Sequence, residues 1–155
     1  MIIYLGSDHR GFTLKEYIKA FLRNAGYSVS DLGNASYEEG DDYPDYIKEV
    51  AMKVSKNPEM GRGIVLCGSG VGADVVANKF PRVRCALAGG ADQAFDSRND
   101  DDSNMLALGA NYLKEENAKK IVMTWLETPF SGEERHRGRI RKIALIEDEL
   151  SGKRG

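Results

Sequence analysis

Short apolar segments alternate with amphipathic helical segments along the whole of this 155-residue chain. The apolar runs indicate short strands at 2–6, 27–32, 63–67, 83–88 and 105–108. Apolar residues at helical spacing indicate helices before Gly26, from Pro44 to Lys56, from Ala73 to Lys79, and around 93–97, 118–125 and 140–146. Parallel neighbours need crossover connections, so this order predicts an α/β fold with a parallel sheet of about five strands and helices on both faces.

The length and composition restrict the classes of protein to which the chain can belong. A chain of this size predicts one compact domain over residues 1–155, with 150–155 as a flexible tail. A net charge of −2 gives no polycationic signature, so we expect no nucleic acid partner. No apolar run approaches the ~18 residues that cross a bilayer, and two cysteines cannot build a disulfide framework. We therefore expect a cytoplasmic protein with no membrane partner.

A glycine-rich loop follows the most uninterrupted of the expected strands. The strand 63–67 ends at Cys67 and leads directly into Gly68-Ser69-Gly70-Val71-Gly72. Ligands of open α/β sheets bind outside the carboxyl ends of the strands, and glycines let backbone N–H groups and a following helix N-terminus approach an anion. The same donors favour the thiolate form of Cys67, which would then act as a base; the alternative is a small buried apolar cysteine. Cys85 lies inside an apolar strand without such a loop, and we expect a structural role for it.

The loop also matches the dinucleotide fingerprint G-x-G-x-x-A, with Asp92 about 20 residues further on as the acidic residue for a ribose contact. This match indicates a second class of function, the binding of a dinucleotide. However, the fingerprint normally follows the first strand of its fold, whereas this loop follows the third expected strand. A dehydrogenase also needs more chain to bind its substrate, so the sequence favours a small anionic ligand.

Several motifs in one order carry a family resemblance: Gly6-Ser7-Asp8-His9 with Gly11, Asp42-Tyr43-Pro44, Cys67 to Gly72, Ala77-Asn78-Lys79, Ser103-Asn104, Ala107 to Gly109, and Arg135-His136 with Arg139. With these residues the chain resembles the ribose-5-phosphate isomerase B and galactose-6-phosphate isomerase family over nearly its whole length. The resemblance implies a Rossmann-like three-layer sandwich with a C-terminal helix, no cofactor, no metal, and a homodimer or homotetramer with active sites shared between subunits. It also implies an aldose–ketose isomerase of a sugar phosphate, most directly of ribose 5-phosphate to ribulose 5-phosphate.

The resemblance further implies roles for individual residues. In this family the cysteine at the position of Cys67 transfers the proton, and the glycine loop holds the enediolate oxygen. These roles suit a reaction that removes a carbon-bound proton beside a carbonyl and returns it to the adjacent carbon. The catalytic residues implied are Cys67, Ser69 and Asp100. The substrate-binding residues implied are Asp8, His9, Tyr43, Gly68, Gly70, Val71, Gly72, Asp101, Arg135, His136 and Arg139, with His9 and the arginines beside the phosphate.

Two positions depart from the family pattern. Asp100 stands where the family usually has a histidine that helps to open the sugar ring, and a carboxyl group is a poorer proton donor than imidazole near neutrality. Asn111 stands where the family commonly carries an arginine that binds the phosphate. These departures keep open the isomerisation of a tetrose 4-phosphate, of allose or galactose 6-phosphate, or of a sugar acid. A non-catalytic protein that binds a sugar phosphate or a dinucleotide is the alternative from another class.

Overall fold

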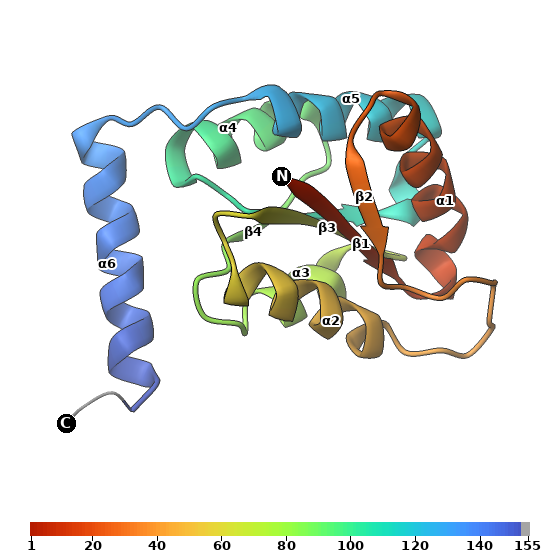
Figure 1. The fold of residues 1–155 in the computed structure, drawn as a ribbon, viewed down its shortest axis with the longest axis horizontal. Coiled ribbons are helices and arrows are strands. Elements are labelled where there is room, and N and C mark those ends of the chain that lie inside the picture. Colours follow the sequence, from red (N-terminus) through yellow and green to blue (C-terminus); the bar gives the residue numbers. More distant parts are fainter. Residues whose placement is uncertain (153–155) are drawn as a thin grey trace.

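A five-stranded parallel sheet forms the centre of the protein, which a computed structural model describes over residues 1–152 (Figure 1). The strands are β1 (Ile2–Ser7), β2 (Ser28–Asp31), β3 (Gly61–Cys67), β4 (Cys85–Leu87) and β5 (Met105–Gly109), in the spatial order β2-β1-β3-β5-β4. The helices are α1 (His9–Asn24), α2 (Tyr43–Lys56), α3 (Val71–Ala77), α4 (Ala91–Asp101), α5 (Glu115–Glu127) and α6 (Glu134–Leu150). The expected α/β three-layer fold with a C-terminal helix is confirmed.

The two faces of the sheet carry separate apolar cores, because successive side chains of a strand point to opposite faces. On one face Ile64 and Leu66 pack with apolar residues of α1, α4 and α5, including the fully buried Trp125. On the other face Val65 and Cys67 pack with apolar residues of α2 and α3. Strand β3 is therefore buried on both faces, which explains why its sequence is an unbroken apolar run rather than an alternating one.

The strand order places a topological switch point between β1 and β3. These two central strands pair in register up to Ser7 and Leu66, so their carboxyl ends lie side by side. From this edge α1 covers one face and α3 covers the other. Helix α1 approaches β3 closely at Gly11, where an added methyl group would lie 2.8 Å from the Cβ of Leu66. The residues just after β1 and β3 therefore meet at the position where open α/β sheets bind ligands.

Helices α3 to α6 extend beyond the ranges that the sequence predicted, and two of these differences, at α3 and α4, lie near the carboxyl ends of strands or bury a charged residue. Helix α4 spans Ala91–Asp101, so the helix expected around 93–97 is longer at both ends than the sequence predicted. Arg98 is buried in this helix because Nε donates to the Thr128 carbonyl at 3.2 Å and Nη1 donates to the Ser103 carbonyl at 2.6 Å. Helix α3 starts at Val71, two residues earlier than expected, directly after a left-handed Gly70.

Helix α6 stands apart from the rest of the chain, on the side of the molecule that lies opposite α1 (Figure 1). The carboxylate of Glu147 accepts hydrogen bonds from the backbone N–H of Arg82 at 3.0 and 3.1 Å and ties the helix to the body. Apolar side chains on α6 remain exposed, among them Leu145 at 61% and Ile146 at 55%. The helix ends at Leu150; of the tail expected at 150–155, residues 153–155 lie outside the described residues. No described helix combines the length and the apolar character needed to cross a bilayer.

Candidate active site

A cavity of about 610 Å³ opens at the carboxyl ends of β1 and β3. It contains the cysteine at the end of β3, the glycine loop that follows, the residue after β1, and the first residue of α2. The residues of this cavity that the sequence predicted as site residues are Asp8, Tyr43, Cys67, Gly68, Ser69, Val71 and Gly72. Its other lining residues are Arg10, Val75, Asn111 and Tyr112. The fold therefore brings together segments that are up to about a hundred residues apart.

Cys67 is 4% exposed and lies on the wall of this cavity. The backbone N–H of Gly70 donates a hydrogen bond to Sγ at 3.2 Å and holds the sulfur against the loop. The other cysteine has a different setting, because burial, with Asp74 beside it, raises the pKa of the Cys85 thiol well above its ordinary value. Both cysteines are free, and only Cys67 lines this cavity.

The shape of the glycine loop depends on Gly70. This residue has a φ of +80°, and an added methyl group there would lie 2.8 Å from the backbone of both Leu108 and Gly109. A side chain at position 70 is therefore excluded both by conformation and by space. The hydroxyl of Ser69 accepts a hydrogen bond from the N–H of Val71 at 3.2 Å. One backbone N–H donor of the loop is therefore already hydrogen-bonded within the loop.

Tyr43 reaches the cavity from the start of α2. An added methyl group on Gly72 would lie 2.5 Å from Cζ of the tyrosine, which shows that the ring packs directly on this glycine. The segment Asp42-Tyr43-Pro44 forms the start of α2, and Pro44 suits the first turn because a helix needs no backbone N–H donor there. The packing of Tyr43 on Gly72 thus joins α2 to the glycine loop.

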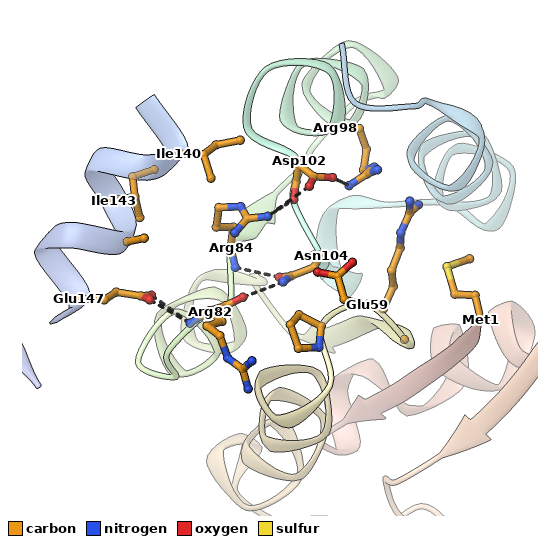
Figure 2. Close-up of a pocket in the computed structure, with 14 residues that line it drawn as sticks. Met1, Glu59, Arg82, Arg84, Arg98, Asp102, Asn104, Ile140, Ile143 and Glu147 are labelled. Carbon is orange, nitrogen blue, oxygen red and sulfur yellow. Dashed lines mark hydrogen bonds and ion pairs between the residues drawn. The ribbon is translucent and has the colours of Figure 1, made fainter. Parts of the chain in front are cut away.

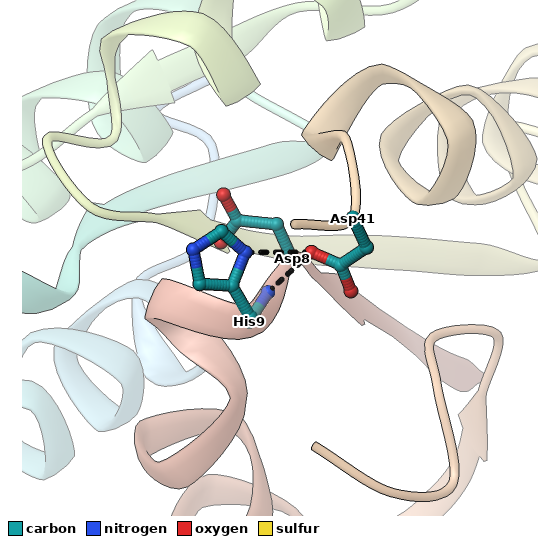
Figure 3. Close-up of side chains that lie close together, drawn as sticks. All are labelled: Asp8, His9 and Asp41. Atoms are coloured by element: carbon teal, nitrogen blue, oxygen red, sulfur yellow. Dashed lines mark hydrogen bonds and ion pairs between the residues drawn. The ribbon is translucent and has the colours of Figure 1, made fainter. Parts of the chain in front are cut away.

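Asp8, His9 and Asp41 lie close together, and His9 is hydrogen-bonded to Asp41 (Figure 3). Asp8 caps α1 by accepting the N–H of Gly11 at 3.1 Å. Asp41 Oδ1 accepts hydrogen bonds from the backbone N–H and from Nδ1 of His9, both at 2.8 Å. The hydrogen bond to Asp41 raises the pKa of His9 above its ordinary value, with the charges of Asp8 and Asp41 adding to the effect against desolvation. Three potential metal-ligand atoms lie within 4.8 Å of one another here, but these hydrogen bonds already explain their arrangement.

The sequence analysis did not identify Asp41. It lies in the polar loop between β2 and α2, where Asn34 Nδ2 donates to its other carboxylate oxygen at 2.9 Å. The buried Lys15 of α1 in turn holds the Asn34 carbonyl at 3.1 Å and the Asp31 carboxylate at 2.6 Å. The loop therefore folds back onto α1 and delivers Asp41 to His9. The sequence feature that could have identified Asp41 is the pair of aspartates before Tyr43. However, such a pair in a polar loop is equally typical of side chains that contact only solvent, so it does not predict a contact with His9.

The remaining predicted site residues lie elsewhere in the chain. The side chain of Asp100 lies near the first turn of α6, where its Oδ1 is 3.6 Å from Nε2 of His136. Arg135 is exposed and pairs with Glu133 at 2.7 Å, and Arg139 lies one turn further along the helix. Asp101 borders a separate cavity between α4 and α6. None of these residues lines the cavity of Cys67.

A further cavity, of about 320 Å³, lies between α6 and the sheet and is rich in arginine (Figure 2). Its arginines serve the fold: Arg84 Nε donates to the Asp101 carbonyl at 2.8 Å, and Arg98 Nη1 pairs with Asp102 at 2.7 Å. Asn104 also belongs to this network, because its side chain bridges the backbones of Arg82 and Arg84. The Ser103-Asn104 motif is thus structural, since Ser103 Oγ likewise accepts the indole N–H of Trp125 at 2.8 Å.

Comparison with known proteins agrees with this geometry. The model of the Ribose/Galactose Isomerase family matches residues 3–143. The chain is 41% identical over 145 residues to ribose-5-phosphate isomerase B of Escherichia coli, covering 94% of this chain and 95% of that protein. It is 40% identical over 147 residues to a probable ribose-5-phosphate isomerase B of Mycoplasma genitalium, covering 95% and 96% of the two chains.

Solved structures agree as well. Ribose-5-phosphate isomerase B of Clostridium thermocellum superposes with a TM-score of 0.91 at 43% identity, covering 97% of this chain and 99% of that one. The Mycoplasma genitalium enzyme with bound ribulose 5-phosphate superposes with a TM-score of 0.92 at 39% identity, covering 96% and 97%. The fold, the cysteine-bearing cavity and these full-length similarities together show that the chain belongs to the ribose/galactose isomerase family.

Proposed function

We propose that this protein is an aldose–ketose isomerase that interconverts ribose 5-phosphate and ribulose 5-phosphate. The observation that carries the proposal is the position of Cys67, which lines a cavity formed with the glycine loop, Asp8 and Tyr43, and whose Sγ accepts a hydrogen bond from the loop. The relative from Mycoplasma genitalium, which has the same fold, binds ribulose 5-phosphate.

The proposed reaction moves one carbon-bound proton. The Cys67 thiolate removes the proton from C2 of the open-chain aldose, the C2–H electrons form the C1=C2 bond, and O1 takes the negative charge. The thiol then returns the proton to C1 while the hydroxyl proton moves from O2 to O1, giving the ketose. In this proposal Ser69, which lines the cavity, passes this second proton. Backbone N–H groups of residues 68–72 stabilise the enediolate, an effect for which one donor typically contributes about 3–4 kcal/mol.

The working form in this proposal is a homodimer or a larger homo-oligomer in the cytoplasm. Two observations support an oligomer: the exposed apolar side chains of α6, and the absence of Arg135, His136 and Arg139 from the lining of the cavity that Cys67 borders. A second subunit that covers α6 would bury those apolar side chains and could take the two arginines into its own cavity. There they would bind the substrate phosphate through charge-assisted hydrogen bonds.

One observation favours a second candidate substrate. Asp100 replaces the histidine that opens the sugar ring in related enzymes, so a sugar phosphate that needs no ring opening suits this chain. A tetrose 4-phosphate is such a substrate, because it cannot close a furanose ring through a phosphorylated hydroxyl. The reaction and the role of Cys67 are the same for both substrates.

Proton exchange with deuterated water tests the proposed function directly. Cys67→Ala should lower both isomerisation and deuterium incorporation at the sugar by about 10²–10⁴-fold, because the base is lost, while sugar phosphate still binds. Cys85→Ala is the matched control, since that cysteine lies outside the cavity, and it should keep turnover. Absence of any deuterium incorporation by the native protein, across ribose, erythrose, allose and galactose phosphates, would contradict the proposal.

A further inference from the structure

A single arginine lines the cavity of Cys67, and the sequence analysis gave it no role. Arg10 lies in the first turn of α1, directly after His9, and its side chain is exposed. Among the residues that line the cavity, Arg10 is the one cation and Asp8 is the one carboxylate. Within residues 1–152 no carboxylate pairs with its guanidinium. Nothing in the fold of this chain therefore requires a cation at this position.

The side chain of Arg10 lies over the glycine loop together with Asn111. An added methyl group on Gly68 would lie 2.8 Å from Arg10 Cδ, 3.3 Å from Arg10 Nη1, and 3.0 Å from Asn111 Nδ2. The two side chains therefore converge on one point of the cavity wall, beside the residue that follows Cys67. The backbone N–H of Asn111 donates to the Gly68 carbonyl at 2.9 Å and fixes this arrangement. The absence of a side chain at position 68 is what leaves room for both.

We propose that Arg10 and Asn111 form one half of the phosphate-binding subsite, with Arg10 supplying the positive charge. A phosphate dianion needs charge-assisted donors, and a guanidinium presents several of them in a plane. Asn111 contributes a neutral N–H donor, so the charge comes from the first turn of α1 and not from the segment after β5. This inference rests on the proposed function, because it takes the phosphate of the sugar as the ligand.

Substitution of Arg10 by methionine tests the assignment while it keeps the length of the side chain. R10M should raise the KM for ribose 5-phosphate about ten- to a hundredfold, the value of one or two hydrogen bonds to a charged group, and leave kcat within a few-fold. R23M is the matched control, since Arg23 is an exposed residue of the same helix outside the cavity. The double variant R10M/N111R should recover most of the lost affinity, because both side chains reach the same point.

Binding of inorganic phosphate, followed by calorimetry or NMR, separates this inference from the proposed function. The native protein and R23M should bind phosphate equally, and R10M should bind it about tenfold or more weakly, whether or not the protein isomerises any sugar. The inference is overturned if R10M and R23M bind phosphate alike, if the native protein does not bind phosphate, or if N111R fails to restore binding. A fall in kcat at unchanged KM would also overturn it, because Arg10 would then act on the reacting carbons.

Discussion

Replacement of Gly70 by alanine is expected to destabilise the protein far more than replacement of another left-handed glycine. A residue with a side chain costs about 1–2 kcal/mol in this conformation. At Gly70 the new methyl group would also lie 2.8 Å from the backbone at Leu108 and Gly109 and 2.6 Å from Leu87 Cδ1. Backbone atoms at the end of a central strand cannot move aside cheaply, and such overpacking adds about 1–3 kcal/mol. The two contributions together predict a loss of about 2–5 kcal/mol in the free energy of unfolding.

Gly40 provides the matched control. Its φ is +89°, close to that of Gly70, but an added methyl group there would meet no atom within 4 Å. Gly40→Ala should therefore lose only the conformational part, about 1–2 kcal/mol. Urea unfolding at equal protein concentration measures both variants, because the chain's single tryptophan, Trp125, is fully buried and reports on the core. Equal losses of stability in the two variants would contradict the argument that the backbone at Leu108 and Gly109 excludes a side chain at position 70.

Two further predictions concern Asp41, which contacts His9, and Asp100, which lies outside the cavity of Cys67. Asp41→Asn should lower the pKa of His9 in an NMR titration, since the hydrogen bond to Asp41 raises it; an unchanged pKa would contradict this origin. Because the pKa of His9 is raised in the folded state, the His9–Asp41 pair stabilises the fold while His9 is protonated. This stabilisation is lost as the pH rises through the folded-state pKa. The free energy of unfolding should therefore depend less on pH in the Asp41→Asn variant. Asp100→His should increase turnover of ring-closed ribose 5-phosphate relative to a tetrose phosphate in a coupled assay, because imidazole is the better proton donor near neutrality. No improvement would show that the aspartate serves another substrate.

The part of the site that the sequence predicted is the part built from contiguous residues. The run 63–67 is apolar without interruption, and the glycines after it are recognisable wherever the chain lies. The sequence alone therefore identifies Cys67 and the glycine loop as a candidate site. Asp8 and Tyr43 needed the family resemblance, because a single aspartate or tyrosine at the start of a helix has many ordinary roles.

Other residues could not be assigned because their partners are distant in the chain. Arg98 lies just beyond the helix expected around 93–97, yet it is buried in α4, where carbonyl groups of Ser103 and Thr128 accept its hydrogen bonds. Asp41 looked like a solvated loop residue, yet Lys15 and Asn34 hold that loop against α1 and direct the carboxylate to His9. In each case the deciding contact joins segments that no local pattern relates.

The sequence by itself determined the order of strands and helices, the buried character of β3, and the glycine loop with its cysteine. Each of these follows from the spacing of apolar residues or from the conformational freedom of glycine, which are local properties of the chain. The tertiary structure alone decided that Arg10 and Asn111 converge beside Gly68, and that Asp100 and the arginines of α6 lie away from Cys67. These relations depend on the order and register of parallel strands, because crossover connections bring together residues that are far apart in sequence.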